Sequence, residues 1–352
     1  MIINYKHRIT TQQGKIVDAS APVIISASRS TDIPAFYSDW FINRLRKGYV
    51  VWKNPFNQQP IYISFKNTKV IVFWTKNPKP LIPYLHELDN RGIHYYFQFT
   101  LNDYVAEGFE PNVPSIEERI ETFRQLSEMI GKGRVIWRFD PLIVTPQLTL
   151  HDLLVKIWNL GNKLKGLTDK LVFSFIDING YRKVQNNLVK EITQFTKETI
   201  EKAEFTQQQM NDIADGLSKC RNRWAKEGWN IQLATCGEQI DLDRFSISHN
   251  RCIDAELMKR LWPDDKELLY YLSYGELPNS LFGIDFLQPA LTPEKLKDKG
   301  QRKVCGCMVS KDIGQYNTCP HQCVYCYANS SKELVMKNWQ KHLDNPLSET
   351  IT

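Results

Sequence analysis

Short apolar runs separated by segments of helical spacing occupy the first 240 residues of this chain. The apolar runs lie at 23–28, 70–74, 95–100, 134–139, 171–176 and 231–235. Segments of helical spacing lie at 35–47, 81–90, 115–130, 151–163 and 192–227. Strands that alternate with helices predict βαβ units sharing one parallel sheet. Six strands in this alternation indicate an α/β fold, a TIM-like parallel βα barrel that is either complete or partial.

The 352 residues are enough for one large domain with an appended segment. We expect the barrel to span 1–290 and a cysteine-rich C-terminal segment, 291–352, to pack on it. The last residues, 345–352, are expected to be frayed. No run of 18 apolar residues and no signal peptide is found, which predicts a cytoplasmic protein without a membrane partner. A net charge of +6 is compatible with a nucleic-acid partner but does not specify one.

Cysteine is the residue type that indicates chemistry. Five of the eight cysteines fall between Cys305 and Cys326. Because cytosolic thiols stay reduced, clustered cysteines indicate metal rather than disulfides. Cys319, Cys323 and Cys326 have the spacing C-x3-C-x2-C, and three thiolates on one loop can ligate three irons of a 4Fe–4S cluster and leave the fourth open. Zinc is the competing metal, but a structural zinc ion takes four ligands, and His321 is cramped as the fourth.

Four further cysteines form a second candidate metal set. They are Cys236, Cys252, Cys305 and Cys307. Four thiolates suit an auxiliary 4Fe–4S cluster or a closed zinc site. The alternative is that Cys236 and Cys252 are small buried apolar side chains. Cys220, in a polar helical stretch, is expected to take no part.

Polar residues recur where the predicted strands end. The candidates for cofactor binding among them are Asp32, Lys76, Thr100, Arg138 and Asp140. The carboxyl ends of barrel strands form the rim of the active site, so we expect these side chains to converge. Lys and Arg suit carboxylate or phosphate, and Asp suits ribose hydroxyls. Salt bridges in a barrel mouth would use the same residue types.

Residues 316–328 read Y-N-T-C-P-H-Q-C-V-Y-C-Y-A and resemble the cluster loop of radical S-adenosylmethionine enzymes. The resemblance is greatest to the spore photoproduct lyase and DNA-repair-photolyase-like branch. It implies a 4Fe–4S cluster whose open iron binds S-adenosylmethionine and whose reduction yields a 5′-deoxyadenosyl radical. It also implies that Tyr325 lies near the adenine, and that a reductase, flavodoxin or ferredoxin supplies electrons. The substrate stays open, with nucleic acid a candidate by analogy.

Other motifs of that branch occur here in family order. They are S-T-D-I-P at 30–34, T-K-N-P at 75–78, a strand ending at Thr100 followed by E-P at 110–111, and R-F-D-P-L at 138–142. The cluster loop, which comes first in the family, comes last here, so the chain resembles a circularly permuted member. The whole chain also resembles the DUF1848 family, which shares the S-A-S-R-x-T-D-I-P-A-F start and the N-T-C-x-H-x-C-x-Y-C-Y-A end.

Two functions of other classes are kept as alternatives. One is an iron–sulfur protein that transfers electrons or has no catalytic role. The other is a zinc-stabilised nucleic-acid-binding protein, for which affinity would depend on salt. The absence of concentrated Lys and Arg runs counts against the second alternative.

Overall fold

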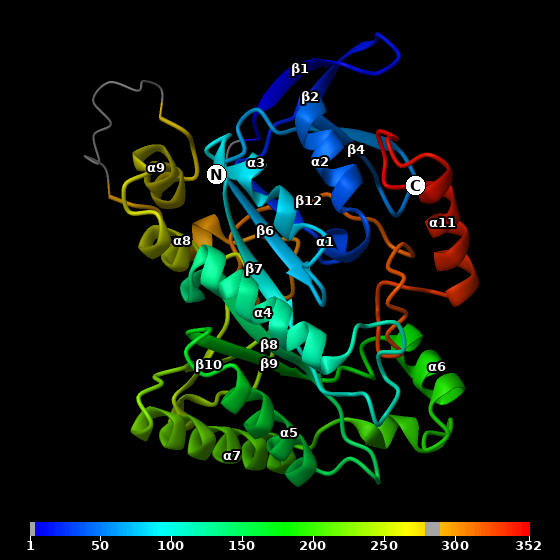
Figure 1. The fold of residues 1–352 in the computed structure, drawn as a ribbon, viewed down its shortest axis with the longest axis vertical. Helices are drawn as coiled ribbons and strands as arrows, with labels where there is room; N and C mark the ends of the chain where they lie inside the picture. Colours follow the sequence, from blue (N-terminus) through cyan, green and yellow to red (C-terminus); the bar gives the residue numbers. More distant parts are fainter. Residues whose placement is uncertain (1–3, 279–288) are drawn as a thin grey trace.

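A sheet of eight parallel strands lies at the centre of the computed structural model, which describes residues 4–278 and 289–352 (Figure 1). Its order is β11-β10-β9-β8-β7-β6-β3-β12. The strands are β3 (Ile24–Ala27), β6 (Val70–Thr75), β7 (His94–Thr100), β8 (Val135–Leu142), β9 (Lys170–Phe175), β10 (Gln232–Thr235), β11 (Ile247–His249) and β12 (Lys311–Asp312). The predicted parallel α/β sheet is confirmed, and all six predicted strands belong to it.

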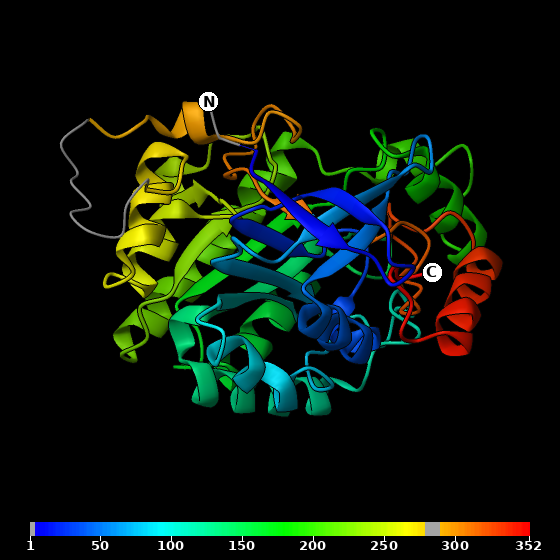
Figure 2. The same cartoon turned by 90° about the horizontal axis from the view of Figure 1, so that it is seen from above.

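One edge of the sheet comes from the far end of the chain. From β3 to β11 the strands follow one another in chain order, each parallel to the last. β12 pairs with the free side of β3, with Lys311 opposite Ile25 and Asp312 opposite Ser26. This pairing brings the C-terminal segment beside the first strand of the sheet. In Figure 2 the same segment runs from the side of α9 to α11 at the opposite side.

A second, four-stranded sheet was not predicted. Its order is β1-β2-β5-β4, formed by β1 (Lys6–Thr10), β2 (Ile16–Ser20), β5 (Pro60–Ser64) and β4 (Tyr49–Lys53). Each of these strands carries exposed or half-buried positions, so none forms a continuous apolar run. This sheet also binds the chain end, because Val51 N donates to Glu349 O at 2.8 Å. The expectation of a frayed C-terminus is wrong, and Ile351 is buried.

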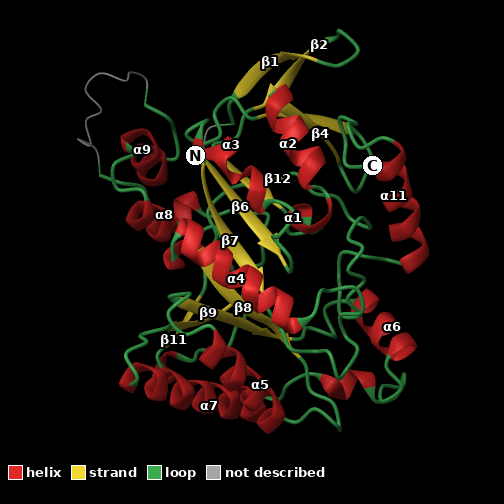
Figure 3. Cartoon of the chain, viewed as in Figure 1, coloured by secondary structure: helices red, strands yellow, loops and turns green. Residues whose placement is uncertain are grey.

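Helices flank the large sheet, as the colouring by secondary structure shows (Figure 3). They are α1 (Ile33–Phe36), α2 (Ser38–Lys47), η1 (Ile82–Tyr84), α3 (Leu85–Asp89), α4 (Ile116–Ile130), α5 (Leu150–Lys163), α6 (Arg182–Glu191), α7 (Gln207–Lys226), α8 (Ala255–Leu261), α9 (Lys266–Tyr274) and α11 (Lys332–Asp344). None of the helices in the described ranges is long and apolar enough to cross a membrane.

Two helix predictions differ from the structure. The helix expected at 35–47 is interrupted at Tyr37, whose backbone (φ −128°) is not helical, so α1 and α2 are separate. The helix expected at 192–227 begins only at Gln207, because the side chain of Thr206 accepts from Gln209 N and sets a new N-cap. Polarity alone did not distinguish the turns before Thr206 from helix.

Both faces of the large sheet are buried, which explains why its strands are continuous apolar runs. Along β6, Ile71 and Phe73 belong to the larger core, which includes side chains of α2, α4 and α5. Their neighbours Val70 and Val72 belong to a second core with side chains of α8, α9 and the C-terminal segment. The C-terminal segment is therefore part of the covering of this second face.

Ser115 forms the predicted capping box of α4. Its Oγ accepts from Glu118 N at 3.3 Å, and the Glu118 carboxylate accepts from Ser115 N at 3.2 Å. Ser115→Ala is expected to lower the free energy of unfolding by about 1 kcal/mol, because a helix-end amide loses its acceptor. Ser115→Asn supplies another acceptor and should recover most of the loss. Urea unfolding measures both variants, and an alanine variant as stable as the unsubstituted chain contradicts the prediction.

Candidate functional site

The carboxylate of Asp312 fixes the C-terminal segment to the carboxyl end of β3. It accepts from Ser28 Oγ at 2.7 Å, from Arg29 N at 2.8 Å and from Gly314 N at 2.8 Å. On the far side of the same segment, Trp52 Nε1 donates to Gly314 O at 2.8 Å. These contacts determine where the cysteine-rich loop that follows is placed.

The loop that carries Cys319, Cys323 and Cys326 is held by residues that follow the strand ends. Tyr37 Oη donates to Thr318 O at 2.5 Å, and Asn112 Nδ2 donates to Pro320 O at 2.9 Å. The ring of His321 is buried between the Asp32 carboxylate, 2.9 Å from Nε2, and Asn112 O, 3.1 Å from Nδ1. The loop therefore lies across the carboxyl ends of the first strands of the sheet, where the sequence predicted the site.

A buried polar network lies beneath this loop. Lys76 Nζ donates to Glu110 Oε1 at 2.6 Å and to the Tyr325 hydroxyl at 2.9 Å. Asn102 Nδ2 donates to the same two groups, at 2.9 and 3.1 Å. The Tyr325 hydroxyl itself hydrogen-bonds to Glu110, and Arg119 Nη1 lies 3.6 Å from Glu110 Oε2. Sequence reasoning missed Asn102, although it lies only two residues beyond the end of β7.

Both members of the Lys76–Glu110 pair are charged. Burial lowers the pKa of Lys76, but the Glu110 carboxylate more than offsets this effect, so the pKa is raised. Burial raises the pKa of Glu110, yet Lys76 and Arg119 together hold it below its ordinary value. An ammonium group is therefore fixed beside the loop, where Coulomb interactions are stronger than in water.

The three loop thiols are held together in this polar but buried setting. Burial raises the pKa of all three, that of Cys323 to about 12, and Cys326 further raises the pKa of Cys319 and of Cys323. The charge of Lys76 lowers the pKa of Cys323 and of Cys326. Thiols in such surroundings keep their protons until a metal replaces them.

The loop supplies three thiols, the number that an iron–sulfur cube with one open iron takes and one fewer than a structural zinc ion takes. In the described parts of the chain, no three His, Cys, Asp or Glu side chains are already arranged to hold one metal ion. A cube binds each thiolate through a different iron, so its ligands stand farther apart than those of one ion. A zinc ion would need a fourth ligand. His321 is engaged through both ring nitrogens, by Asp32 and by Asn112 O.

The five predicted rim residues lie on neighbouring strand ends, but several are occupied. The Asp32 carboxylate accepts from Ala35 N at 3.0 Å and Lys76 N at 2.7 Å besides meeting His321. Thr100, the last residue of β7, lies opposite Arg138 in the strand register. On the neighbouring strand β8, Arg138 pairs with Asp140, Nε to Oδ2 at 3.1 Å.

The second set of cysteines also converges. Cys236 Sγ lies 3.5 Å from Cys252 Sγ, and Cys252 N donates to Cys307 Sγ at 3.1 Å. A hydrogen bond from the Cys307 thiol is the main reason that the pKa of Cys305 is lowered to about 7. Arg138 Nη1 lies 3.2 Å from Cys252 Sγ. The four residues come from three separate segments of the chain.

A hydrogen-bonded path joins the two sets of thiols. Arg138 contacts Cys252 at one end and Asp140 at the other. Asp140 N donates to Asn102 Oδ1 at 2.9 Å, and Asn102 Nδ2 contacts the Tyr325 hydroxyl in the cysteine loop. The rim residues therefore lie between the two cysteine sets rather than around only one of them.

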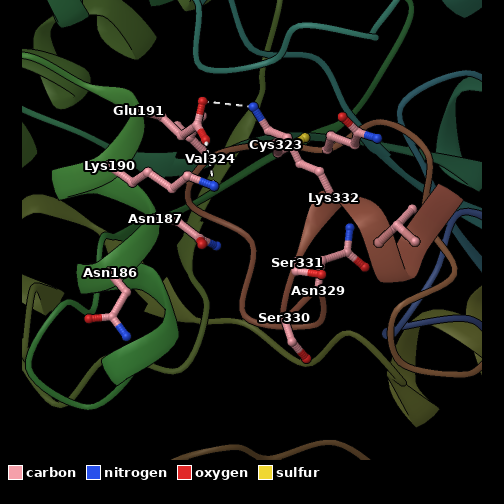
Figure 4. A pocket seen from close by; sticks show the side chains of 12 residues that line it. Asn186, Asn187, Lys190, Glu191, Cys323, Val324, Asn329, Ser330, Ser331 and Lys332 are labelled. Atoms are coloured by element: carbon pink, nitrogen blue, oxygen red, sulfur yellow. Dashed lines mark hydrogen bonds and ion pairs between the residues drawn. The ribbon is translucent and has the colours of Figure 1, made fainter.

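A pocket of about 210 Å³ opens beside the loop (Figure 4). Cys323 and Val324 line it from the loop, and polar side chains of α6 line it from the other side. Lys332 Nζ, at the start of α11, closes one part of the wall through an ion pair with Glu191 Oε2 at 2.7 Å. The lining carries amide and charged groups, so the pocket suits a polar ligand.

Fold and site together define an α/β protein in which a C-terminal three-cysteine loop covers the strand ends of a parallel sheet. The family described as Domain of unknown function (DUF1848) matches residues 24–328, and the chain belongs to this family. No curated protein matches the chain. Among solved structures, one match is a protein from Bacteroides thetaiotaomicron described as a candidate alpha-L-fucosidase. It is 11% identical, with a TM-score of 0.28, over 79% of this chain and 83% of that one.

Gly314 is expected to tolerate no side chain. A Cβ there would lie 1.9 Å from Ser28 Oγ and 2.5 Å from Ser28 Cβ. Gly314→Ala should lower the free energy of unfolding by about 1–3 kcal/mol, the usual cost of overpacking, and speed hydrogen exchange in 305–328. Gly300→Ala is the matched control, because its Cβ would meet only Asp298 Oδ1, at 3.2 Å. Equal exchange in the two variants would contradict this docking.

Glu110→Gln is expected to lower the free energy of unfolding by about 3–5 kcal/mol, because it leaves buried cations unpaired. Lys76→Met together with Glu110→Gln should be less destabilised than Glu110→Gln alone, since one unpaired cation is gone. Denaturant unfolding of both single variants and the double variant gives the coupling energy. Additive losses would show that Lys76 and Glu110 do not interact.

Proposed function

We propose that this protein is a radical S-adenosylmethionine enzyme built on a partial TIM-like βα barrel. Cys319, Cys323 and Cys326 would bind a 4Fe–4S cluster at the carboxyl ends of the strands. The observation that carries the proposal is the pairing of β12 with β3, which delivers the C-terminal loop to the first strand of the sheet. A circular permutation requires this placement. A cluster loop that has moved to the C-terminal end of the sequence must still lie beside the first strand in the folded protein.

The residues beneath the loop are suited to support a negatively charged metal centre. When bound, the cluster and S-adenosylmethionine would supply reductive cleavage of the sulfonium to a 5′-deoxyadenosyl radical. The fixed ammonium of Lys76 would offset the charge of the thiolates. Glu110 holds both Lys76 and the Tyr325 hydroxyl in place, and Asn102 donates to Glu110 and to that hydroxyl. Preorganised charge of this kind costs no reorganisation when the reaction begins.

The rim residues divide into two roles in this proposal. Asp32 positions the loop, because its carboxylate is taken up by protein donors, including His321. Thr100, Arg138 and Asp140 lie on the two central strands and are the proposed contacts to S-adenosylmethionine, with Tyr325 beside the adenine. Arg138 and Asp140 pair with each other, so binding would require that pair to open or to be shared with the cofactor. Arginine and aspartate suit the carboxylate and the ribose hydroxyls of that cofactor, respectively.

The proposal also includes partners. A cytoplasmic reductase, flavodoxin or ferredoxin would donate the electron, and the partly exposed loop tyrosines Tyr316 and Tyr327 mark the side from which it could approach. The polar pocket between α6 and the loop is the proposed substrate entrance, because Cys323 is part of its wall. A nucleic acid is one candidate substrate.

Anaerobic purification tests the proposal. About four irons and four sulfides per chain should be bound at the loop. The EPR signal of the reduced protein should change when S-adenosylmethionine is added, and methionine and 5′-deoxyadenosine should be released. Replacing Cys319, Cys323 and Cys326 by alanine should abolish the signal that responds to S-adenosylmethionine. Cys220→Ala is the matched control and should leave it unchanged.

Two outcomes would contradict this function. Zinc without sulfide at Cys319, Cys323 and Cys326 would indicate a structural site. A loaded and reduced cluster that neither responds to S-adenosylmethionine nor cleaves it, with candidate substrates present, would indicate an electron-transfer protein.

A further inference from the structure

The four cysteines outside the loop come together from three separate segments. Cys236 directly follows β10, Cys252 lies between β11 and α8, and Cys305 and Cys307 precede β12. Cys252 and Cys307 are buried, and the other two are half-buried. None of the four belongs to the proposed S-adenosylmethionine site.

Two of the four sulfur atoms lie at the separation that one metal ion requires, and side-chain rotation is needed to gather three or more ligands of the described chain around one point. Cys236 Sγ and Cys252 Sγ are 3.5 Å apart, and Cys307 Sγ accepts from Cys252 N at 3.1 Å. A tetrahedral zinc ion with Zn–S bonds of about 2.3 Å has S···S edges of about 3.8 Å. An iron–sulfur cube binds each thiolate through its own iron and needs wider spacing. The observed separation therefore favours a single ion over an auxiliary cluster.

Hydrogen-bond donors and cations surround these sulfurs. Backbone amides donate to Cys307 Sγ, from Cys252 N at 3.1 Å and Ile253 N at 3.5 Å. Cys252 Sγ accepts from Asn250 Nδ2 at 3.4 Å and from Arg138 Nη1 at 3.2 Å. Four thiolates and one divalent ion carry a net charge of −2, which such donors stabilise. Cysteines buried only as small apolar side chains would need none of them.

We propose that Cys236, Cys252, Cys305 and Cys307 bind one divalent metal ion, zinc, as a closed tetrathiolate site. Cys236 Sγ contacts Cys252 Sγ, Cys252 N donates to Cys307 Sγ, and side-chain rotation would bring the four sulfurs into a tetrahedron. Four protein ligands leave no open position, which is typical of structural zinc. The ion would fasten the segment before β12 to β10 and so support the docking of the cysteine loop.

The proposal is tested in a chain whose loop site has been removed. The Cys319→Ala, Cys323→Ala and Cys326→Ala background is purified anaerobically, and its zinc, iron and sulfide are measured. About one zinc per chain and no sulfide are expected. Adding Cys307→Ser or Cys252→Ser should reduce zinc to near zero, and adding Cys220→Ser should leave it at about one. The unsubstituted chain provides the same zinc measurement if the background variant does not fold.

Cobalt(II) gives a second readout. The metal-free background protein, titrated with cobalt(II), should develop the intense visible bands of tetrahedral cobalt–thiolate coordination at one equivalent, and Cys252→Ser should lose them. Sulfide with about four irons that depend on Cys252 and Cys307 would overturn the proposal in favour of an auxiliary cluster. Metal content indifferent to these substitutions would overturn it in favour of free thiols. Loss of the S-adenosylmethionine response in the background variant bears only on the loop site.

Discussion

The candidate site depends on one interaction, the capture of the β3 end by the carboxylate of Asp312. Asp312 and Ser28 are 284 residues apart, yet their hydrogen bond joins the first and last strands of the chain's parallel sheet. A two-residue strand offers few backbone hydrogen bonds, so the hydrogen bonds that this carboxylate accepts from Ser28, Arg29 and Ser30 carry much of the docking. The entropy of closing so long a loop grows only slowly with its length, which makes such a distant edge strand feasible.

Fixed cations face both sets of thiols. Lys76 lies beside the loop cysteines, held by Glu110, and Arg138 lies beside Cys252, held by Asp140. In both cases a carboxylate keeps the cation charged despite its burial. Burying these cations costs desolvation free energy, which a protein without anionic centres nearby would not recover. Thiolates that ligate a metal in a region of low dielectric constant would offset this cost, because they attract the cations strongly there.

The two faces of the sheet are covered by different parts of the chain. Helices α2, α4 and α5 pack on one face in a large apolar core. The other face is covered by α8, α9 and the C-terminal segment, and it contains Cys252 and Cys307. A metal ion there would lie in a mostly apolar setting close to the polar rim. Asn102 links the polar rim to the cysteine loop, since its side chain contacts Asp140 N and the Tyr325 hydroxyl.

The sequence by itself determined the features that depend on near neighbours. Apolar runs located six strands of the sheet, the Ser115 capping box located the start of α4, and the C-x3-C-x2-C spacing located the loop. The sequence did not show that residues 192–206 lie outside the helix, because they are as polar as a surface helix. It also did not predict the sheet of β1, β2, β4 and β5, because these strands lack apolar runs.

Only the tertiary structure decided which distant residues meet. Contacts between segments remote in sequence are the pairing of β12 with β3, the hydrogen bonds from Ser28 and Arg29 to Asp312, and the convergence of Cys236 with Cys252 and Cys307. The physical reason is that strand pairing and side-chain convergence depend on long-range contacts and burial, which no local pattern of residues encodes.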